Sequence, residues 1–287
     1  MTIGGRGVIK LDNWIMIYYY ARDRPASAGA GTPGTQKEPT MSTAIASRTV
    51  GEIVAESPAA ARVFERHAID YCCGGNIPLS TACERRGAPL DKVLHELEEA
   101  LATGPAADDT DWRRRSMSDL IDHIESTHHA RMRSELPRAR ELIGAVVRAH
   151  GESDPTLHEL AAIFDAFASE LEMHLLKEER VLFPAIRSIE QKPAGSNANG
   201  GACCAIEAPI RVMMEEHDHS GEALKRMRAL TNDFTPPPGA CNTYRVMIDT
   251  LAGIERDIHQ HVHKENNILF PGARAMTAAR SAAAPGA

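Results

Sequence analysis

Two stretches of the sequence repeat one pattern of residues that can bind a metal. Residues 174–184 and residues 261–271 each begin with a histidine, place a glutamate four residues later, and end in Leu-Phe-Pro. Residues four apart on an α-helix lie on the same face, one turn from each other. Each stretch can therefore hold one metal centre with an imidazole and a carboxylate from a single helix.

Two more histidines extend the repeat. His129 lies 45 residues before His174, and His217 lies 44 residues before His261. The chain therefore contains two helix pairs in tandem, each supplying a His and then a His-x-x-x-Glu. This repeat predicts a pseudo-twofold centre with two metal ions side by side, two bridging carboxylates and two histidines per ion. The predicted ligands are His129, His174, Glu178, His217, His261 and Glu265.

The ligand types favour iron. A single histidine on an apolar stripe is usually a hydrogen-bonded core residue, but four helices that each offer one are a different case. Two glutamates buried without partners would be strongly destabilising, and a divalent ion would neutralise them. Imidazole and carboxylate ligands suit iron, and they would also suit manganese or zinc. Structural zinc sites are usually closed and tetrahedral, so bridging carboxylates and open positions predict two non-haem iron ions.

Four long helices must bring these ligands together. Apolar stripes at helical spacing predict helices over residues 119–150, 155–189, 209–231 and 242–271, and each stripe contains a histidine. The predicted fold class is therefore all-α, with an up-down four-helix bundle over residues 118–274. Ferritin-like di-iron bundles carry Glu-x-x-His on two helices. The order here is His and then Glu, which argues against that class.

A second unit precedes the bundle. Residues 47–103 predict a small helical domain, in which Thr49 and Glu52 form a capping box. Its turn, residues 70–75, reads Asp-Tyr-Cys-Cys-Gly-Gly. Residues 104–117 are a predicted linker and residues 275–287 a flexible tail. Residues 1–46 are a predicted disordered extension, because Ala, Gly, Pro, Ser and Thr dominate much of it; one hypothesis places the true start at Met41.

Composition restricts the function further. The formal net charge is -7 among 287 residues, which argues against general nucleic-acid binding. The apolar run at residues 14–20 is shorter than the roughly 20 residues that span a bilayer, so no membrane anchor is predicted. Six cysteines in so long a chain do not indicate a disulfide scaffold. We therefore expect a cytoplasmic protein with reduced thiols.

These motifs together resemble a known family over nearly all of residues 49–274. The bundle resembles a hemerythrin-like domain, and the unit with Cys72 and Cys73 resembles the small domain attached to it in the RIC family, the di-iron proteins for repair of iron centres. The resemblance implies a non-haem di-iron centre with the same six ligands. It also implies repair of iron–sulfur clusters damaged by oxidative or nitrosative stress, by supply of iron. Damaged iron–sulfur proteins, nitric oxide and oxygen are then the expected partners.

Several alternatives stay open at this stage. The centre could instead bind or sense oxygen or nitric oxide, or act as a nitric oxide reductase, and a homodimer is one option for assembly. Cys72 and Cys73 could be redox or transfer thiols, metal ligands, or small residues in a turn. Glu179 is expected to be solvated. The histidines that neighbour the predicted ligands are expected to lie outside the ligand set: His128, His219, His259 and His263.

Overall fold

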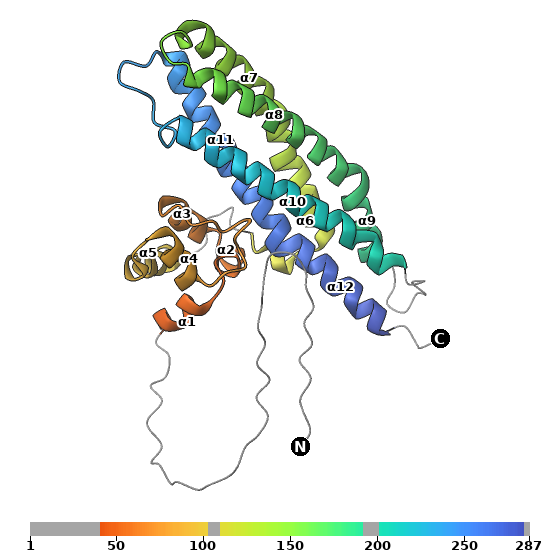
Figure 1. Cartoon of the computed structure of the whole chain (residues 1–287). Helices are drawn as coiled ribbons and strands as arrows, with labels where there is room; N and C mark the ends of the chain where they lie inside the picture. The colour runs from red at the N-terminus through yellow and green to blue at the C-terminus, as the bar shows by residue number, and fades with distance from the viewer. Residues whose placement is uncertain (1–40, 103–109, 192–200, 284–287) are drawn as a thin grey trace, which may run out of the picture. The chain divides into compact units, whose positions relative to one another are not determined.

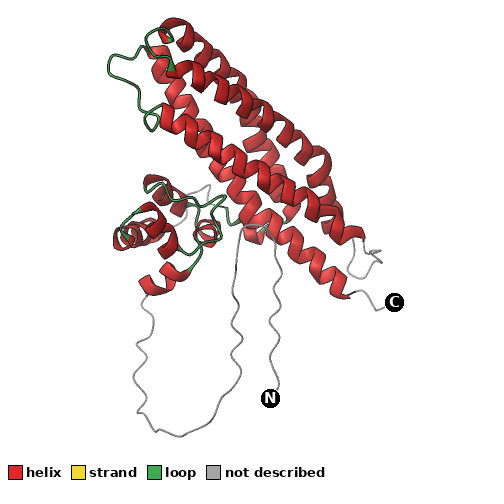
Figure 2. Cartoon of the chain, viewed as in Figure 1, coloured by secondary structure: helices red, strands yellow, loops and turns green. Residues whose placement is uncertain are grey.

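The computed structural model describes residues 41–102, 110–191 and 201–283. Within these ranges the chain forms helices joined by loops and turns, without β-strands (Figure 2). The all-α fold predicted from the sequence is thereby confirmed. The helices form a small N-terminal unit and a bundle of four long rods (Figure 1).

The N-terminal unit is built from five short helices around an apolar core. The side chain of Thr49 accepts a hydrogen bond from the backbone N–H of Glu52, and the Glu52 carboxylate accepts one from the N–H of Thr49. This reciprocal pair is the predicted capping box, and it starts the second helix. The helices are α1 (Met41–Ser47), α2 (Val50–Glu56), α3 (Ala59–Arg66), α4 (Leu79–Arg86) and α5 (Leu90–Ala102).

The ordered chain begins earlier than the sequence predicted. Helix α1 lies mostly within residues 1–46, which were expected to be disordered. Ile45 is buried in the core of the N-terminal unit, and this apolar contact packs α1 against that core. Residues 1–40, and with them the proposed extension, lie outside the described residues.

Each rod of the bundle is one long helical segment, and three of the rods contain a π-helical turn. Successive rods run in opposite directions (Figure 1). A 3₁₀ turn, η1 (Trp112–Arg114), precedes the first rod. The rods are α6 (Met117–His123), η2 (Ile124–His129) and α7 (Ala130–His150); α8 (Thr156–Lys177), η3 (Glu178–Leu182) and α9 (Phe183–Gln191); α10 (Gly201–Leu230); and α11 (Asn242–Lys264), η4 (Glu265–Leu269) and α12 (Phe270–Ala283).

Two helix ends differ from the prediction. The fourth rod continues to Ala283, although Pro271 was expected to end it, and the third rod begins at Gly201, before Pro209. Pro271 lies in the first turn of α12, directly after the π-helical turn η4, and Pro184 has the same place after η3. Both prolines lie inside a continuous rod, where a missing N–H removes one backbone hydrogen bond, and in both rods the preceding turn has π-type in place of α-type hydrogen bonds. Leu-Phe-Pro therefore marks a change of helix type and not a helix end.

Two apolar clusters fill the bundle. One joins α7, α8, α10 and α11 through side chains such as Leu136, Phe164 and Leu251. The other joins α6, α9, α10 and α12 through side chains such as Ile121, Ile186 and Phe270. None of the described helices is both long enough and apolar enough to cross a membrane. The rods meet along buried side chains, and the predicted metal ligands lie on these same inward faces.

Candidate metal centre

The six residues predicted as ligands are brought together inside the bundle. Each is buried, with 0 to 3% of its surface exposed. Three of the four rods place a predicted ligand at a π-helical turn, because η2 ends at His129, η3 begins at Glu178 and η4 begins at Glu265. π-helical turns occur frequently at functional sites. His174, His217 and His261 come from α8, α10 and α11.

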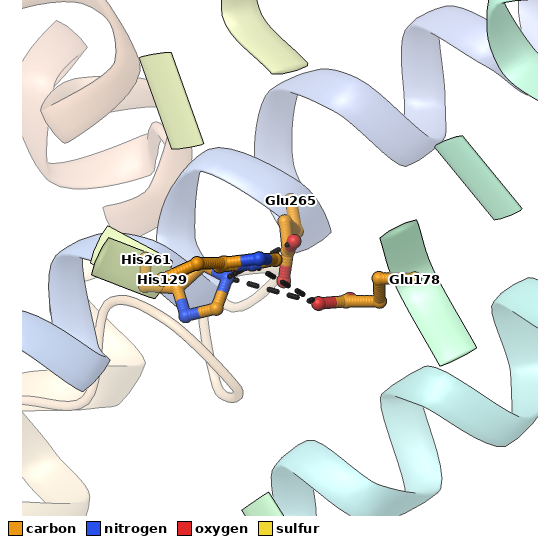
Figure 3. A group of neighbouring side chains, drawn as sticks. All are labelled: His129, Glu178, His261 and Glu265. Carbon is orange, nitrogen blue, oxygen red and sulfur yellow. Dashed lines mark hydrogen bonds and ion pairs between the residues drawn. The ribbon is translucent and has the colours of Figure 1, made fainter. Parts of the chain in front are cut away.

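The first half of the centre contains His129 and His261, which we name the 129/261 half-site (Figure 3). The Nε2 atoms of its two histidines are 3.2 Å apart. Glu178 Oε2 lies 3.4 Å from Nε2 of His129, and Glu265 Oε1 lies 3.1 Å from Nε2 of His261. One potential ligand atom from each of the four side chains falls within 4.8 Å of the others.

The second half contains His174 and His217, and we name it the 174/217 half-site. Their Nε2 atoms are 3.1 Å apart. The remaining oxygens of the same two glutamates serve this half: Glu178 Oε1 is 3.3 Å from His174 Nε2, and Glu265 Oε2 is 3.1 Å from His217 Nε2. Each carboxylate thus offers one oxygen to each half-site, which is the arrangement of two bridging ligands.

This geometry fits metal ions bound between the side chains. With bonds of roughly 2.1 Å, two ligands at right angles around one ion are about 3.0 Å apart. The observed spacings of 3.1 to 3.4 Å between Nε2 and oxygen atoms are close to that value. Both oxygens of Glu178 and Oε2 of Glu265 are buried without a hydrogen-bond partner in the described structure. Buried carboxylates need compensation, which a cation would supply.

Three of the four histidines are oriented through their second ring nitrogen. His129 Nδ1 lies 2.7 Å from a Glu179 oxygen, His174 Nδ1 lies 2.9 Å from a Glu216 oxygen, and His217 Nδ1 lies 3.0 Å from Asn266 Oδ1. Such partners fix the ring and raise its basicity as a ligand. The expectation that Glu179 is solvated was wrong. Its position directly after Glu178 was the one sign in the sequence that Glu179 lies near the centre. Its partner His129 lies on another rod, so the contact itself could not be predicted from the sequence.

The neighbouring histidines divide into buried and exposed ones. His128 is buried, and its ring stacks on that of His261 with centroids 5.5 Å apart. His263 is buried too, and its Nδ1 lies 3.3 Å from the carbonyl oxygen of Tyr71. Burial lowers the pKa of both imidazoles to about 4. His219 is exposed and His259 half-buried.

Metal binding is expected to release protons at neutral pH. Burial lowers the pKa of His174, but the Glu178 and Glu265 carboxylates and Glu216 outweigh it and raise the pKa to about 9. The metal-free protein therefore carries a proton on His174 at pH 7, and a metal ion must displace it. Addition of ferrous iron to weakly buffered metal-free protein should acidify the solution, and the apparent affinity should rise between pH 7 and 9. A proton count of zero at pH 7 would contradict this.

Cys72 and Cys73 lie beside the centre and not within it. The Cys73 thiol donates to the carbonyl oxygen of His217 at 3.7 Å, so it contacts the backbone of a predicted ligand residue. Cys72 is buried, and its hydrogen bond to Cys73, together with burial, raises the pKa of its thiol. Both line a cavity of about 1150 Å³ between the N-terminal unit and the bundle. Neither belongs to the two groups of potential metal ligands.

Asn267 joins the cysteine turn to the bundle. It lies in η4, two residues after Glu265, and its Nδ2 donates to the carbonyl oxygens of Tyr71 and Cys72 at 3.3 and 3.2 Å. The chain approaches so closely that a Cβ added at Gly75 would lie 2.4 Å from Asn267 Oδ1 and 2.7 Å from the Tyr71 carbonyl oxygen. The absence of a side chain at residue 75 permits this contact.

Replacing Gly75 by alanine is therefore expected to destabilise the contact. Overpacking a tight site costs about 1–3 kcal/mol, because backbone atoms must move. Thermal unfolding should show a lower melting temperature for Gly75→Ala, while Gly144→Ala, at a helical position whose nearest neighbour is the end of the Arg148 side chain at 3.4 Å, serves as the matched control. Equal melting temperatures would mean that the contact adapts without cost.

Comparison with known proteins agrees with both units. Residues 46–101 match the Domain of Unknown function (DUF542), and residues 120–273 match the Hemerythrin HHE cation binding domain. The iron-sulfur cluster repair protein YtfE of Yersinia pseudotuberculosis (serotype IB, strain PB1/+) is 37% identical over 226 residues, which cover 79% of this chain and 96% of that protein. The protein of the same name from Yersinia pestis (strain Pestoides F) has the same identity and coverage. The chain therefore belongs to the hemerythrin HHE family, within the group that includes the iron–sulfur cluster repair proteins.

Proposed function

We propose that the six buried side chains hold two iron ions and that the protein restores damaged iron–sulfur clusters by supplying iron. The observation that carries the proposal is the sharing of both glutamates: each has one oxygen in the 129/261 half-site and the other in the 174/217 half-site. That pattern is the expected one for a pair of ions, because a single ion would leave half of the donors without a partner.

The ligand set supports iron and an exchangeable site. Each half-site has two imidazole nitrogens and two carboxylate oxygens, and no thiolate. Such ligands suit iron, manganese or zinc, and four protein donors leave positions free on a six-coordinate ion. The bound iron would supply transferable metal and a place for a small ligand such as nitric oxide or oxygen. The relatives bear the name of iron-sulfur cluster repair proteins, which supports damaged iron–sulfur proteins as the clients.

The chain's own residues have three roles in this proposal. The four imidazoles bind the metal through Nε2, while Glu179 and Glu216 orient two of them and lead towards the surface. Protonation of an imidazole would remove it as a ligand. Glu179 and Glu216 bond to two of these imidazoles and affect how readily they take up a proton, so they would also affect the release of iron. Cys72 and Cys73 would act as transfer or redox thiols at the edge of the centre, where Cys73 touches the backbone of His217.

The decisive experiment measures repair of a damaged enzyme. An iron–sulfur dehydratase is inactivated with nitric oxide or peroxide, freed of the reagent, and incubated without oxygen with the iron-loaded protein. We expect recovery of activity beyond that given by the same amount of free ferrous iron. Glu265→Gln should be inactive, and Glu215→Gln, at an exposed position of α10, should match the unsubstituted protein. Recovery no greater than with free iron would refute the proposal.

Two other outcomes would assign the centre a different task. Nitrous oxide formed over many turnovers, with a reductant present and loss on substitution of either glutamate, would indicate a nitric oxide reductase. Rapid, reversible optical changes with oxygen, without loss of iron and without cluster repair, would indicate a binding or sensing protein.

A further inference from the structure

The two half-sites are built from corresponding residues, but their surroundings differ. The tandem repeat pairs His174 with His261, each four residues before a bridging glutamate. The lysines three residues after these histidines correspond too, Lys177 and Lys264. The residues just before the other two histidines, Glu216 and His128, also correspond. The residues just after the bridging glutamates, Glu179 and Asn266, correspond as well. The repeat therefore shows two exchanges: Glu216 of one half-site is replaced by the imidazole of His128 in the other, and the amide of Asn266 is replaced by the carboxylate of Glu179.

In the 174/217 half-site, both imidazoles have an acceptor at Nδ1. Glu216 accepts from His174 at 2.9 Å, and Asn266 Oδ1 accepts from His217 at 3.0 Å. Glu216 in turn receives a hydrogen bond from Lys177. A carboxylate on the second nitrogen fixes the ring and strengthens the first nitrogen as a ligand.

In the 129/261 half-site, only His129 has such an acceptor, the carboxylate of Glu179. Nδ1 of His261 is buried and has no hydrogen-bond partner in the described structure. The position that corresponds to Glu216 is His128, whose ring stacks on His261 and offers it no carboxylate. Lys264 Nζ lies 2.9 Å from His128 Nε2, so a half-buried ammonium group stands behind this histidine.

The charges around His128 do not restore the balance. Asp257 Oδ1 lies 3.2 Å from His128 Nδ1, and it also pairs with Arg131 at 3.7 Å. One carboxylate therefore faces two cations, Arg131 and Lys264. Around His174, one carboxylate faces one cation, and that carboxylate bonds directly to the ligand. Glu179, which bonds to His129, is likewise paired with one cation, Arg133. The groups around the 129/261 half-site therefore carry one positive charge more than their carboxylates balance, and those around the 174/217 half-site carry none.

We infer that the two metal positions are unequal and that the 129/261 position gives up its ion first. His261 lacks the acceptor that would strengthen it as a ligand, and Lys264 adds positive charge close by, so this half-site is the donor for cluster repair, while the 174/217 half-site keeps its ion. The role of this half-site as the iron donor rests on the proposed function. The inequality of the two metal positions rests on the geometry alone. His128 and Lys264 act through His261 and are positioning residues.

The test is the rate at which a chelator removes iron from the fully loaded protein. Loss of an outer hydrogen-bond partner weakens metal binding by roughly 10- to 100-fold. We therefore expect two phases of equal size, one iron leaving roughly 10 to 100 times faster than the other. Samples enriched in ⁵⁷Fe should show two Mössbauer doublets at the start, and one of them should disappear with the fast phase.

Matched variants identify which half-site is which. Glu216→Gln should accelerate the slow phase, because His174 loses its carboxylate. Lys264→Met should slow the fast phase, because positive charge is removed behind His261. Lys177→Met is the control: its lysine has the corresponding place, but it opposes Glu216, so it should not slow the fast phase. A general loss of stability would instead accelerate both phases in every variant. Slower iron release in Lys264→Met therefore cannot come from destabilisation, and it separates the inference from that explanation.

Two results would overturn the inference. One is release of both irons from the unsubstituted protein at the same rate. The other is two phases in which Lys264→Met leaves the fast phase unchanged or accelerates it. Neither result touches the repair assay, which can succeed with two equal irons. Conversely, unequal release combined with no repair of a damaged enzyme would leave the inequality in place and remove the proposed function.

Discussion

The Glu265→Ala variant is expected to lose both metal ions. Oε1 of Glu265 lies 3.1 Å from Nε2 of His261 and Oε2 lies 3.1 Å from Nε2 of His217, so one side chain serves both half-sites. Loss of a residue that only orients a ligand costs about 10- to 100-fold in affinity, and loss of a ligand should cost more at each position. Metal analysis after desalting should find little iron in Glu265→Ala.

Single histidine variants give the contrast that makes this result specific. His217→Ala removes a donor from the 174/217 half-site alone, so about one iron should remain in the other half-site. Glu215→Ala, at an exposed position of the same helix α10, should retain the full content. If Glu265→Ala kept one ion as His217→Ala does, the glutamate would be terminal at one metal and would not bridge.

Removal of the metal should lower the thermal stability of the bundle by a large amount. Glu178 and Glu265 are fully buried, and three of their oxygens have no hydrogen-bond partner in the described structure. An ion at 1,000 times its dissociation constant stabilises the folded state by about 4 kcal/mol. In a domain of this size that corresponds to a decrease in melting temperature of roughly 10 °C when a chelator removes it.

The same Glu265→Ala variant provides the control for the stability measurement. It should bind no metal, so the chelator should leave its melting temperature unchanged. Calorimetry with and without chelator on both proteins measures the effect directly. An unchanged melting temperature for the unsubstituted protein after complete metal removal would show that the imidazoles alone satisfy the buried carboxylates.

The grouping of the six side chains could be predicted from the sequence because much of their spacing is local. His174 and Glu178, like His261 and Glu265, are four residues apart, and helical geometry places them on one face whatever the helix packs against. Apolar stripes likewise predict that these faces turn inward. The doubled order of the histidines then indicated two half-sites. None of these steps required knowledge of how the rods cross.

Other features depend on contacts between rods. Glu179 looked solvated, because it follows Glu178 and adjacent residues point in different directions on a helix; its bond to His129 exists only because another rod passes nearby. The helix continues through Pro271 because the turn before it is π-helical, a local change of hydrogen bonding that residue types do not reveal.

The inequality of the half-sites is decided in the same way. The sequence repeat suggests two equal positions, and only packing reveals that His174 receives a carboxylate at Nδ1 while His261 receives none. Helix periodicity is a local property of the chain, so it indicates from the sequence which side chains point inward. The atoms that face each imidazole come from residues far away along the chain, so they follow from the tertiary fold.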